Sequence, residues 1–205
     1  MSEEPELTEQ NNEREAWSFG EAVMRTLYDL ASVAVSAVVV VLFVFVFGFR
    51  MVGVVQSSMR PTLEPDQSLI VTAFMPHVKQ HDIVIITKPG YKDPLVKRVI
   101  ATGGQTLRID FAAGDVWVDG VLQDEAFISE KITIKSIQNF PLNVDTWVGE
   151  ITVPEKSVFV MGDNRNDSRD SRDEAIGCVR EEYLLGKVLF RIKPFGQWDV
   201  YRTTP

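Results

Sequence analysis

The sequence contains almost no cysteine and almost no histidine. Its 205 residues include one cysteine, Cys178, and two histidines, His77 and His81. A single cysteine excludes an intramolecular disulfide framework and any zinc or iron–sulfur site that needs several cysteines. The scarcity of histidine leaves few ways to build a histidine-dependent enzyme.

The chain also lacks an excess of positive charge. The formal net charge is −8, which argues against nucleic acid as a partner. Residues 1–29 hold eight acidic and two basic side chains, whereas the other 176 residues hold 21 acidic and 19 basic ones. The composition therefore describes an acidic tail on a nearly balanced body. With 45% hydrophobic residues, that body can bury a core.

One long hydrophobic run covers residues 30–49, twenty positions without a charge between Asp29 and Arg50. A helix of this length spans a hydrocarbon core of about 30 Å. A strand is disfavoured despite the many valines, because soluble strands rarely exceed about 10 residues. A cleaved signal peptide would lie nearer the N-terminus, and a buried soluble helix would be unusually apolar on all sides. Arginines flank the run equally, so charge does not settle its orientation.

After residue 50 the pattern changes to short apolar runs separated by turn residues, which predicts strands. Asp119-Gly120 between two valines predicts a tight hairpin, and only a short turn is expected at 180–185. We predict a mainly β fold: one domain over residues 50–205, with residues 111–150 as a β excursion from the main sheet. The expected strands are 68–74, 82–87, 95–101, 106–110, 115–118, 131–137, 157–161 and 187–192.

Residues 56–63, Gln-Ser-Ser-Met-Arg-Pro-Thr-Leu, form the first candidate functional segment. Pro61 fixes its own φ and biases Arg60 toward an extended conformation, which predicts a stiff turn. A serine on such a turn can present its hydroxyl to a substrate, while neighbouring N–H groups point at an oxyanion. An ordinary serine-rich turn is the alternative.

A lysine in the expected strand 95–101 is the second candidate. Alternation places Lys97 on one face with Leu95 and Val99. Apolar neighbours hinder its solvation and lower its pKa, and a neutral lysine can deprotonate a serine hydroxyl. The alternative is an edge-strand lysine that reaches water.

The third candidate is the polar segment 161–172, which follows an apolar strand. Asp163 with Arg165, and Asp170 with Arg172, could form charge pairs that make the loop rigid. A solvated loop and a calcium site are the alternatives. The spacing does not match an EF-hand, and three arginines oppose cation binding.

Together with the hydrophobic run, these segments resemble the type I signal peptidases, membrane-bound serine proteases that remove signal peptides from exported proteins. The similarity covers roughly residues 30–195. Two departures, His81 where the family often has glycine and the absence of aromatic residues at 173–176, touch neither Ser58 nor Lys97. The matching blocks follow in the family's order and are 58–63, 97–99, 162–165 with Ser168, Asp170, Ser171 and Arg172, and the closing strand 186–191.

By position, the resemblance implies that Ser58 is the acylating nucleophile and Lys97 its general base. The Ser58 backbone N–H would supply one oxyanion donor. Part of the family has a serine two residues before the nucleophile as a second donor; here that place is Gln56, which leaves the second donor open. This chemistry needs no metal or organic cofactor. The residues that would position the lysine and support the site are Ser168, Asp170 and Arg172.

The implied substrates are signal-peptide-bearing preproteins, bound extended against the strand edges at 53–57 and before Lys97. Val54 and Val96 would line pockets for the small side chains of an Ala-x-Ala site, and Gln56 and Ser57 complete the expected substrate-binding residues. The resemblance implies a cytoplasmic tail (1–29), a single membrane span (30–49) and an extracytoplasmic catalytic domain. Membrane lipid and the secretion machinery are the other expected partners, and no nucleic acid is expected.

Three other hypotheses stay open at this stage. A self-cleaving regulator could use the same Ser–Lys pair, although it would not need a membrane span. A membrane-anchored binding module would display the 162–172 loop to a partner, with Ser58 and Lys97 as structural residues. A serine–histidine–aspartate hydrolase would depend on His77 or His81 in place of Lys97.

Overall fold

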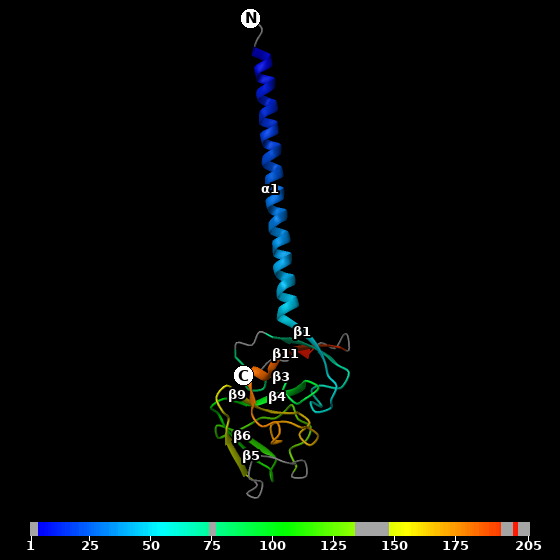
Figure 1. Cartoon of the computed structure of the whole chain (residues 1–205), viewed down its shortest axis with the longest axis vertical. Coiled ribbons are helices and arrows are strands. Elements are labelled where there is room, and N and C mark those ends of the chain that lie inside the picture. The colour runs from blue at the N-terminus through cyan, green and yellow to red at the C-terminus, as the bar shows by residue number, and fades with distance from the viewer. Residues whose placement is uncertain (1–3, 74–76, 134–147, 194–198, 201–205) are drawn as a thin grey trace. The chain divides into compact units, whose positions relative to one another are not determined.

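The computed structural model describes residues 4–73, 77–133, 148–193 and 199–200. Contacts divide the chain into two units, Met1–Phe47 and Gly48–Pro205. The first is a helix and the second is built from strands in two antiparallel sheets (Figure 1). The predicted fold class, an apolar N-terminal helix followed by a β-rich domain, is confirmed.

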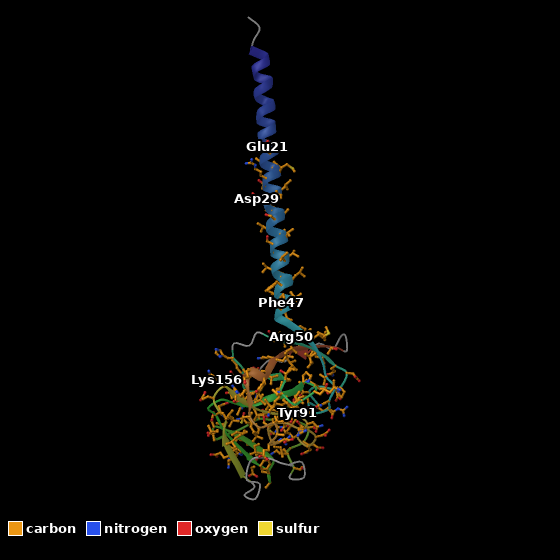
Figure 2. The ribbon with its side chains drawn as sticks, in the orientation of Figure 1. Glu21, Asp29, Phe47, Arg50, Tyr91 and Lys156 are labelled. Atoms are coloured by element: carbon orange, nitrogen blue, oxygen red, sulfur yellow. The ribbon has the colours of Figure 1, made fainter. Side chains whose placement is uncertain are left out.

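Helix α1 spans Glu4–Gly48 and is therefore much longer than the predicted span of 30–49. Pro5 is tolerated because it falls in the first turn, and the following segment is rich in residues with good helix propensity. Residues Phe19–Gly48 are long and apolar enough to cross a membrane. Their side chains project outward all round, and the most apolar window buries none of its residues (Figure 2). The core helix of a soluble protein would be mostly buried, so this exposure argues against that alternative.

The larger sheet has the order β1-β2-β11-β3-β4-β9-β10, with β12 paired to β11. The long strand β11 returns from the C-terminal part of the chain to lie between β2 and β3. The expected short turn at 180–185 contains the 3-10 helix η3, Glu181–Tyr183. The strands of this sheet are β1 (Phe49–Gly53), β2 (Ser68–Thr72), β3 (Ile83–Ile86), β4 (Leu95–Thr102), β9 (Ser157–Met161), β10 (Val179–Arg180), β11 (Leu184–Lys193) and β12 (Asp199–Val200).

The smaller sheet has the order β7-β6-β5-β8. Asp119 and Gly120, at φ 50° and 75°, form the predicted tight turn between β6 and β7. The strand predicted at 131–137 is wrong for residues 131–133, because these residues do not form a β-strand. Residues 134–137 lie outside the described residues. The strands are β5 (Thr106–Asp110), β6 (Asp115–Val118), β7 (Val121–Leu122) and β8 (Val148–Thr152).

Strand β4 passes through the centre of the core. Its residues contribute to three buried clusters: one against the smaller sheet, one around β3 and β9, and one around β1 and β2. On one side β3 pairs with residues 95–98, whereas on the other side the β9 ladder begins only at Arg98. Within the described residues, the stretch 95–97 therefore has one partner strand and one free edge.

Candidate active site

The turn that carries Ser58 is anchored by the residues around it. Met59 and Leu63 are buried in the cluster beside β1 and β2. The Leu63 N–H donates a hydrogen bond to the Met59 carbonyl at 2.9 Å. The Val54 N–H donates to the Gln67 carbonyl at 2.8 Å, which ties together the two ends of the segment. These contacts make the predicted stiff turn, in which Ser58 is 6% exposed.

Lys97 is buried in the middle of β4, with 1% of its surface exposed. Its Nζ donates a hydrogen bond to Ser58 Oγ at 2.6 Å, which joins residues 39 positions apart in the chain. The alternative of a lysine that reaches water from an edge strand is therefore wrong. The structure brings together the two residues that the sequence proposed as nucleophile and base.

Burial lowers the pKa of Lys97 from 10.5 to about 8. The positive charge of Arg172 lowers the pKa as well, while the carboxylates of Asp170 and Asp163 oppose the shift. A pKa of about 8 leaves roughly a tenth of the lysine neutral at pH 7. Desolvation thus prepares this amine to accept a proton near neutral pH.

Asp170 organises the loop behind the lysine. Its carboxylate accepts two hydrogen bonds from the Arg172 side chain at 2.8 and 2.9 Å, one from Ser168 Oγ at 2.6 Å and one from the Gly162 N–H at 2.9 Å. Burial alone would raise the pKa of Asp170, but these donors hold it below its usual value. The predicted Asp170–Arg172 pair is present. The Ser168 hydroxyl is directed to Asp170, and the structure records no hydrogen bond from it to Lys97.

The 162–172 loop also holds the backbone of Ser58. The Asn164 N–H donates to the Ser58 carbonyl at 3.0 Å. Gly162 packs so closely that a Cβ there would lie 2.3 Å from the same carbonyl oxygen. Residues 162–164 therefore hold the Ser58–Met59 peptide group in place.

The predicted pairing of Asp163 with Arg165 is wrong. Asp163 instead accepts two hydrogen bonds from the Arg98 guanidinium, at 2.8 and 2.6 Å, and one from Thr62 Oγ1 at 2.5 Å. Arg165 pairs with Glu125 at 2.5 Å. Partners 65 and 40 positions apart satisfy these buried charges, and proximity in sequence does not reveal them.

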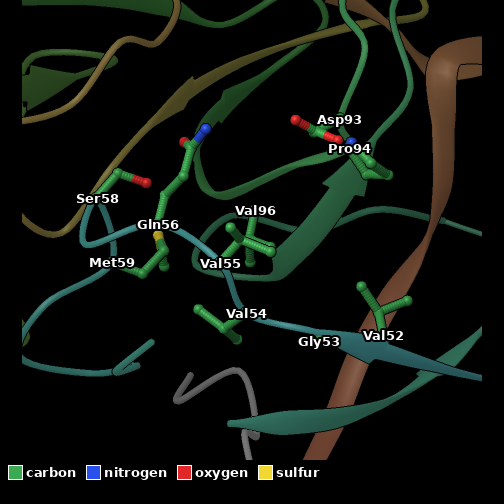
Figure 3. Close-up of a pocket in the computed structure, with 10 residues that line it drawn as sticks. All are labelled: Val52, Gly53, Val54, Val55, Gln56, Ser58, Met59, Asp93, Pro94 and Val96. Atoms are coloured by element: carbon green, nitrogen blue, oxygen red, sulfur yellow. The ribbon is translucent and has the colours of Figure 1, made fainter. Parts of the chain in front are cut away.

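A small pocket of about 80 Å³ begins at Ser58 and runs between residues 52–56 and 93–96 (Figure 3). Val54, Gln56 and Val96, three of the four expected substrate-binding residues, line it. Ser57 is not among its lining residues, because the Ser57 hydroxyl donates to Asp167 at 3.0 Å. The Gln56 amide rises on the same side of the pocket as the Ser58 hydroxyl (Figure 3).

Neither histidine has a hydrogen bond to Ser58 in the described structure: His77 is exposed, and His81 packs against an aromatic ring. The His81 ring packs edge-on against Phe127, with 5.6 Å between the ring centroids. Burial and the nearby Arg98 lower the pKa of His81. Ser58 Oγ accepts its hydrogen bond from Lys97, so the geometry favours a lysine-dependent mechanism over a histidine-dependent one. Among the described residues, no group of three His, Cys, Asp or Glu side chains could hold a metal ion.

Glu125 and Phe127 are neighbours of the site that sequence reasoning missed. The Arg98 guanidinium lies over the Phe127 ring, 4.1 Å from its centroid, and that of Arg165 lies 5.8 Å from it. One signal was available in the sequence: a buried strand that contains Lys97-Arg98 must supply a partner for the arginine as well as for the lysine.

The buried serine–lysine contact and the pocket beside it fit the class of serine hydrolases, and the apolar helix is long enough to cross a membrane. The chain matches the family model described as "Signal peptidase, peptidase S26" over residues 27–193, and it belongs to that family. It is 30% identical over 175 residues to signal peptidase I T of Bacillus subtilis strain 168, covering 84% of this chain and 88% of that protein. It is 33% identical over 153 residues to signal peptidase I P of Bacillus subtilis subsp. natto, covering 73% and 80% respectively. Signal peptidase I of Bacillus caldolyticus is 34% identical over 169 residues, covering 79% and 89%. The resemblance inferred from the sequence is confirmed.

Proposed function

We propose that this signal peptidase cuts preproteins through an acyl-enzyme formed on Ser58, with Lys97 as the general base. Neutral Lys97 takes the hydroxyl proton while Ser58 Oγ attacks the scissile carbonyl. The peptide C–N bond then breaks, and the amine leaves with a proton returned by the lysine. Water, deprotonated by the same lysine, hydrolyses the ester and frees the signal peptide.

The substrate would complete the open part of the larger sheet. Residues 95–97 have a free edge, and the pocket separates them from the chain that continues β1 beyond Gly53. An extended peptide placed between these two edges can pair its backbone with both. Alternate side chains would then face Val54 and Val96, where the small pocket suits the alanines of an Ala-x-Ala site.

The oxyanion that forms during the attack needs donors at the turn. The Ser58 backbone N–H is the first donor in this proposal, because it lies next to the attacking atom. The Gln56 amide is the second, since it lines the same pocket on the side of the hydroxyl (Figure 3). Asp170 and Arg172, together with Ser168, would keep the lysine and the loop in position.

The proposed arrangement in the cell rests on the apolar helix for the anchor and on membership of the family for the orientation. The proposed span is the uncharged run 30–49, which except for Phe49 lies within α1 and its apolar segment Phe19–Gly48, and the proposed catalytic domain begins directly after it. We place the acidic segment 1–29 in the cytoplasm and residues 50–205 outside the membrane, where exported preproteins emerge. Lipid surrounds the span, and the secretion machinery that delivers the preprotein is the proposed partner. Only ten residues separate Gly48 from Ser58, which limits how far the proposed nucleophile can lie from the end of the span and would raise the local concentration of membrane-bound substrate.

The observation that carries this proposal is the buried Lys97–Ser58 contact of 2.6 Å. The test uses the full chain in detergent or lipid with a preprotein that carries an Ala-x-Ala site, and mass spectrometry identifies the bond that is cut. Cleavage after the final alanine is expected, and Ser58→Ala and Lys97→Ala should each abolish it. Lys92→Ala, which changes an exposed lysine nearby in the chain, is the matched control and should cut normally. Normal cleavage by folded Lys97→Ala would refute the lysine's role.

A further inference from the structure

An irregular segment, residues 123–131, crosses from the smaller sheet to the active-site loop; we name it the strap. Both of its ends are attached to β6. The Gln123 N–H donates to the Val116 carbonyl at 2.9 Å, and Lys131 pairs with Asp115 at 2.5 Å. The middle of the strap is free to contact residues outside its own sheet.

The middle of the strap supplies two side chains to the arginines beside the active site. Glu125 pairs with Arg165 where both side chains are at least nine-tenths buried. Phe127 presents its ring to both Arg98 and Arg165, at 4.1 and 5.8 Å from the centroid. A buried guanidinium group is costly unless its charge is compensated, and an anion and the face of an aromatic ring can both do this.

The same two arginines act on the segment that holds the nucleophile. Arg98 directly follows Lys97 in β4 and fixes Asp163 with two hydrogen bonds. Arg165 Nε donates to the Gly162 carbonyl at 3.2 Å. Directly after these two fixed residues, the Asn164 N–H donates to the Ser58 carbonyl. A continuous series of contacts therefore runs from the strap through the arginines to the Ser58 peptide.

We propose that Glu125 and Phe127 are positioning residues for catalysis, through which the smaller sheet holds the arginines that fix the Ser58 turn. The inference rests on the proposed function, because positioning matters only if Ser58 reacts. It assigns a task to the smaller sheet, whose strands contribute no residue to the pocket beside Ser58 among the described residues. Neither residue lines the pocket beside Ser58, so a loss should appear in turnover and not in substrate binding.

The test replaces Phe127 with leucine, which keeps an apolar side chain but removes the ring face. We expect kcat, per active site titrated with an acylating inhibitor, to fall about 5- to 30-fold with KM changed less than about twofold. Phe127→Tyr retains the ring and should restore kcat to within about twofold of wild type. Glu125→Gln, which leaves Arg165 without its counter-charge, should lower kcat in the same way.

The chain offers a matched control in the same sheet. Arg108 lies over the Trp117 ring at 4.7 Å, and neither residue has a recorded contact with the 162–172 loop. Trp117→Leu should therefore leave kcat within about twofold of wild type. Equal kcat values for Phe127→Leu and Trp117→Leu, or no recovery in Phe127→Tyr, would overturn the inference. Failure of the wild type to cut would instead overturn the proposed function, so the two failures are distinguishable.

Discussion

Replacing Gly162 with alanine should disable the enzyme by displacing Ser58, the proposed nucleophile. The added Cβ would lie 2.2 Å from Ser168 Oγ and 2.3 Å from the Ser58 carbonyl oxygen, whereas ordinary contacts begin at 3.4 Å. The serine side chain at 168 can rotate, but the Ser58 backbone has to retreat by about 1 Å. A misplacement of that size lowers the rate about 100-fold. Gly162 does not have a positive φ, so the effect is steric and not a matter of backbone conformation.

The assay compares Gly162→Ala with Gly186→Ala, a replacement that is equally crowded but lies in β11. A Cβ at Gly186 would lie 2.4 Å from Val71 Cγ1 and 2.5 Å from the Thr72 carbonyl oxygen. Overpacking there should reduce stability by about 1–3 kcal/mol, and the folded fraction should still cut normally. Thermal unfolding gives the folded fraction, and preprotein cleavage gives the rate per folded molecule. If Gly162→Ala cuts within a few-fold of wild type per folded molecule, the steric argument is refuted.

Three further predictions concern the lysine and the pocket. Wild-type kcat/KM should rise with pH around pH 8, because Lys97 must lose its proton and its pKa is about 8; a profile flat from neutral to alkaline pH would contradict this. Asp170→Asn removes a carboxylate that raises the pKa of Lys97, so the midpoint of the pH–rate profile should move to lower pH and the maximum rate should fall. A midpoint at the same or a higher pH than in the wild type would contradict this prediction. Val96→Phe should fill the pocket of about 80 Å³ and lower kcat/KM for an Ala-x-Ala substrate, by about tenfold; unchanged kinetics would place the substrate elsewhere.

Local pattern predicted most strands, and tertiary context decided the rest. The β-branched runs of β3, β5, β6 and β9 appear within one or two residues of expectation. β8 was missed because its sequence, Val-Gly-Glu-Ile-Thr, carries a weak strand signal and depends on pairing with β5. The return of β11 between β2 and β3 involves partners about 100 residues or more apart, which no local pattern encodes. Helix α1 extends well before the hydrophobic run from which a membrane span at 30–49 is predicted, because the preceding residues also have good helix propensity.

Within the site, the sequence predicted best the residues whose side-chain type the proposed chemistry requires, a serine and a lysine. A lysine between apolar neighbours in a strand indicated burial, and the structure buries Lys97 against Ser58. Charge pairs were predicted less well. Asp170 and Arg172 are two positions apart and do pair, whereas Asp163 takes its partner from β4. Spacing alone cannot separate these cases, because loop geometry determines which guanidinium each carboxylate reaches.

The free edge at residues 95–97 has a consequence for the resting enzyme. Backbone N–H and C=O groups at an unpaired edge must be hydrated, and such an edge can recruit any extended chain, including another copy of the protein. Three residues form too short a template for lasting self-association. A bound peptide would release the water at this edge and favour the folded state by mass action. Signal peptide retained after cleavage should therefore protect the enzyme against heat while competing with the next preprotein for the same strand position.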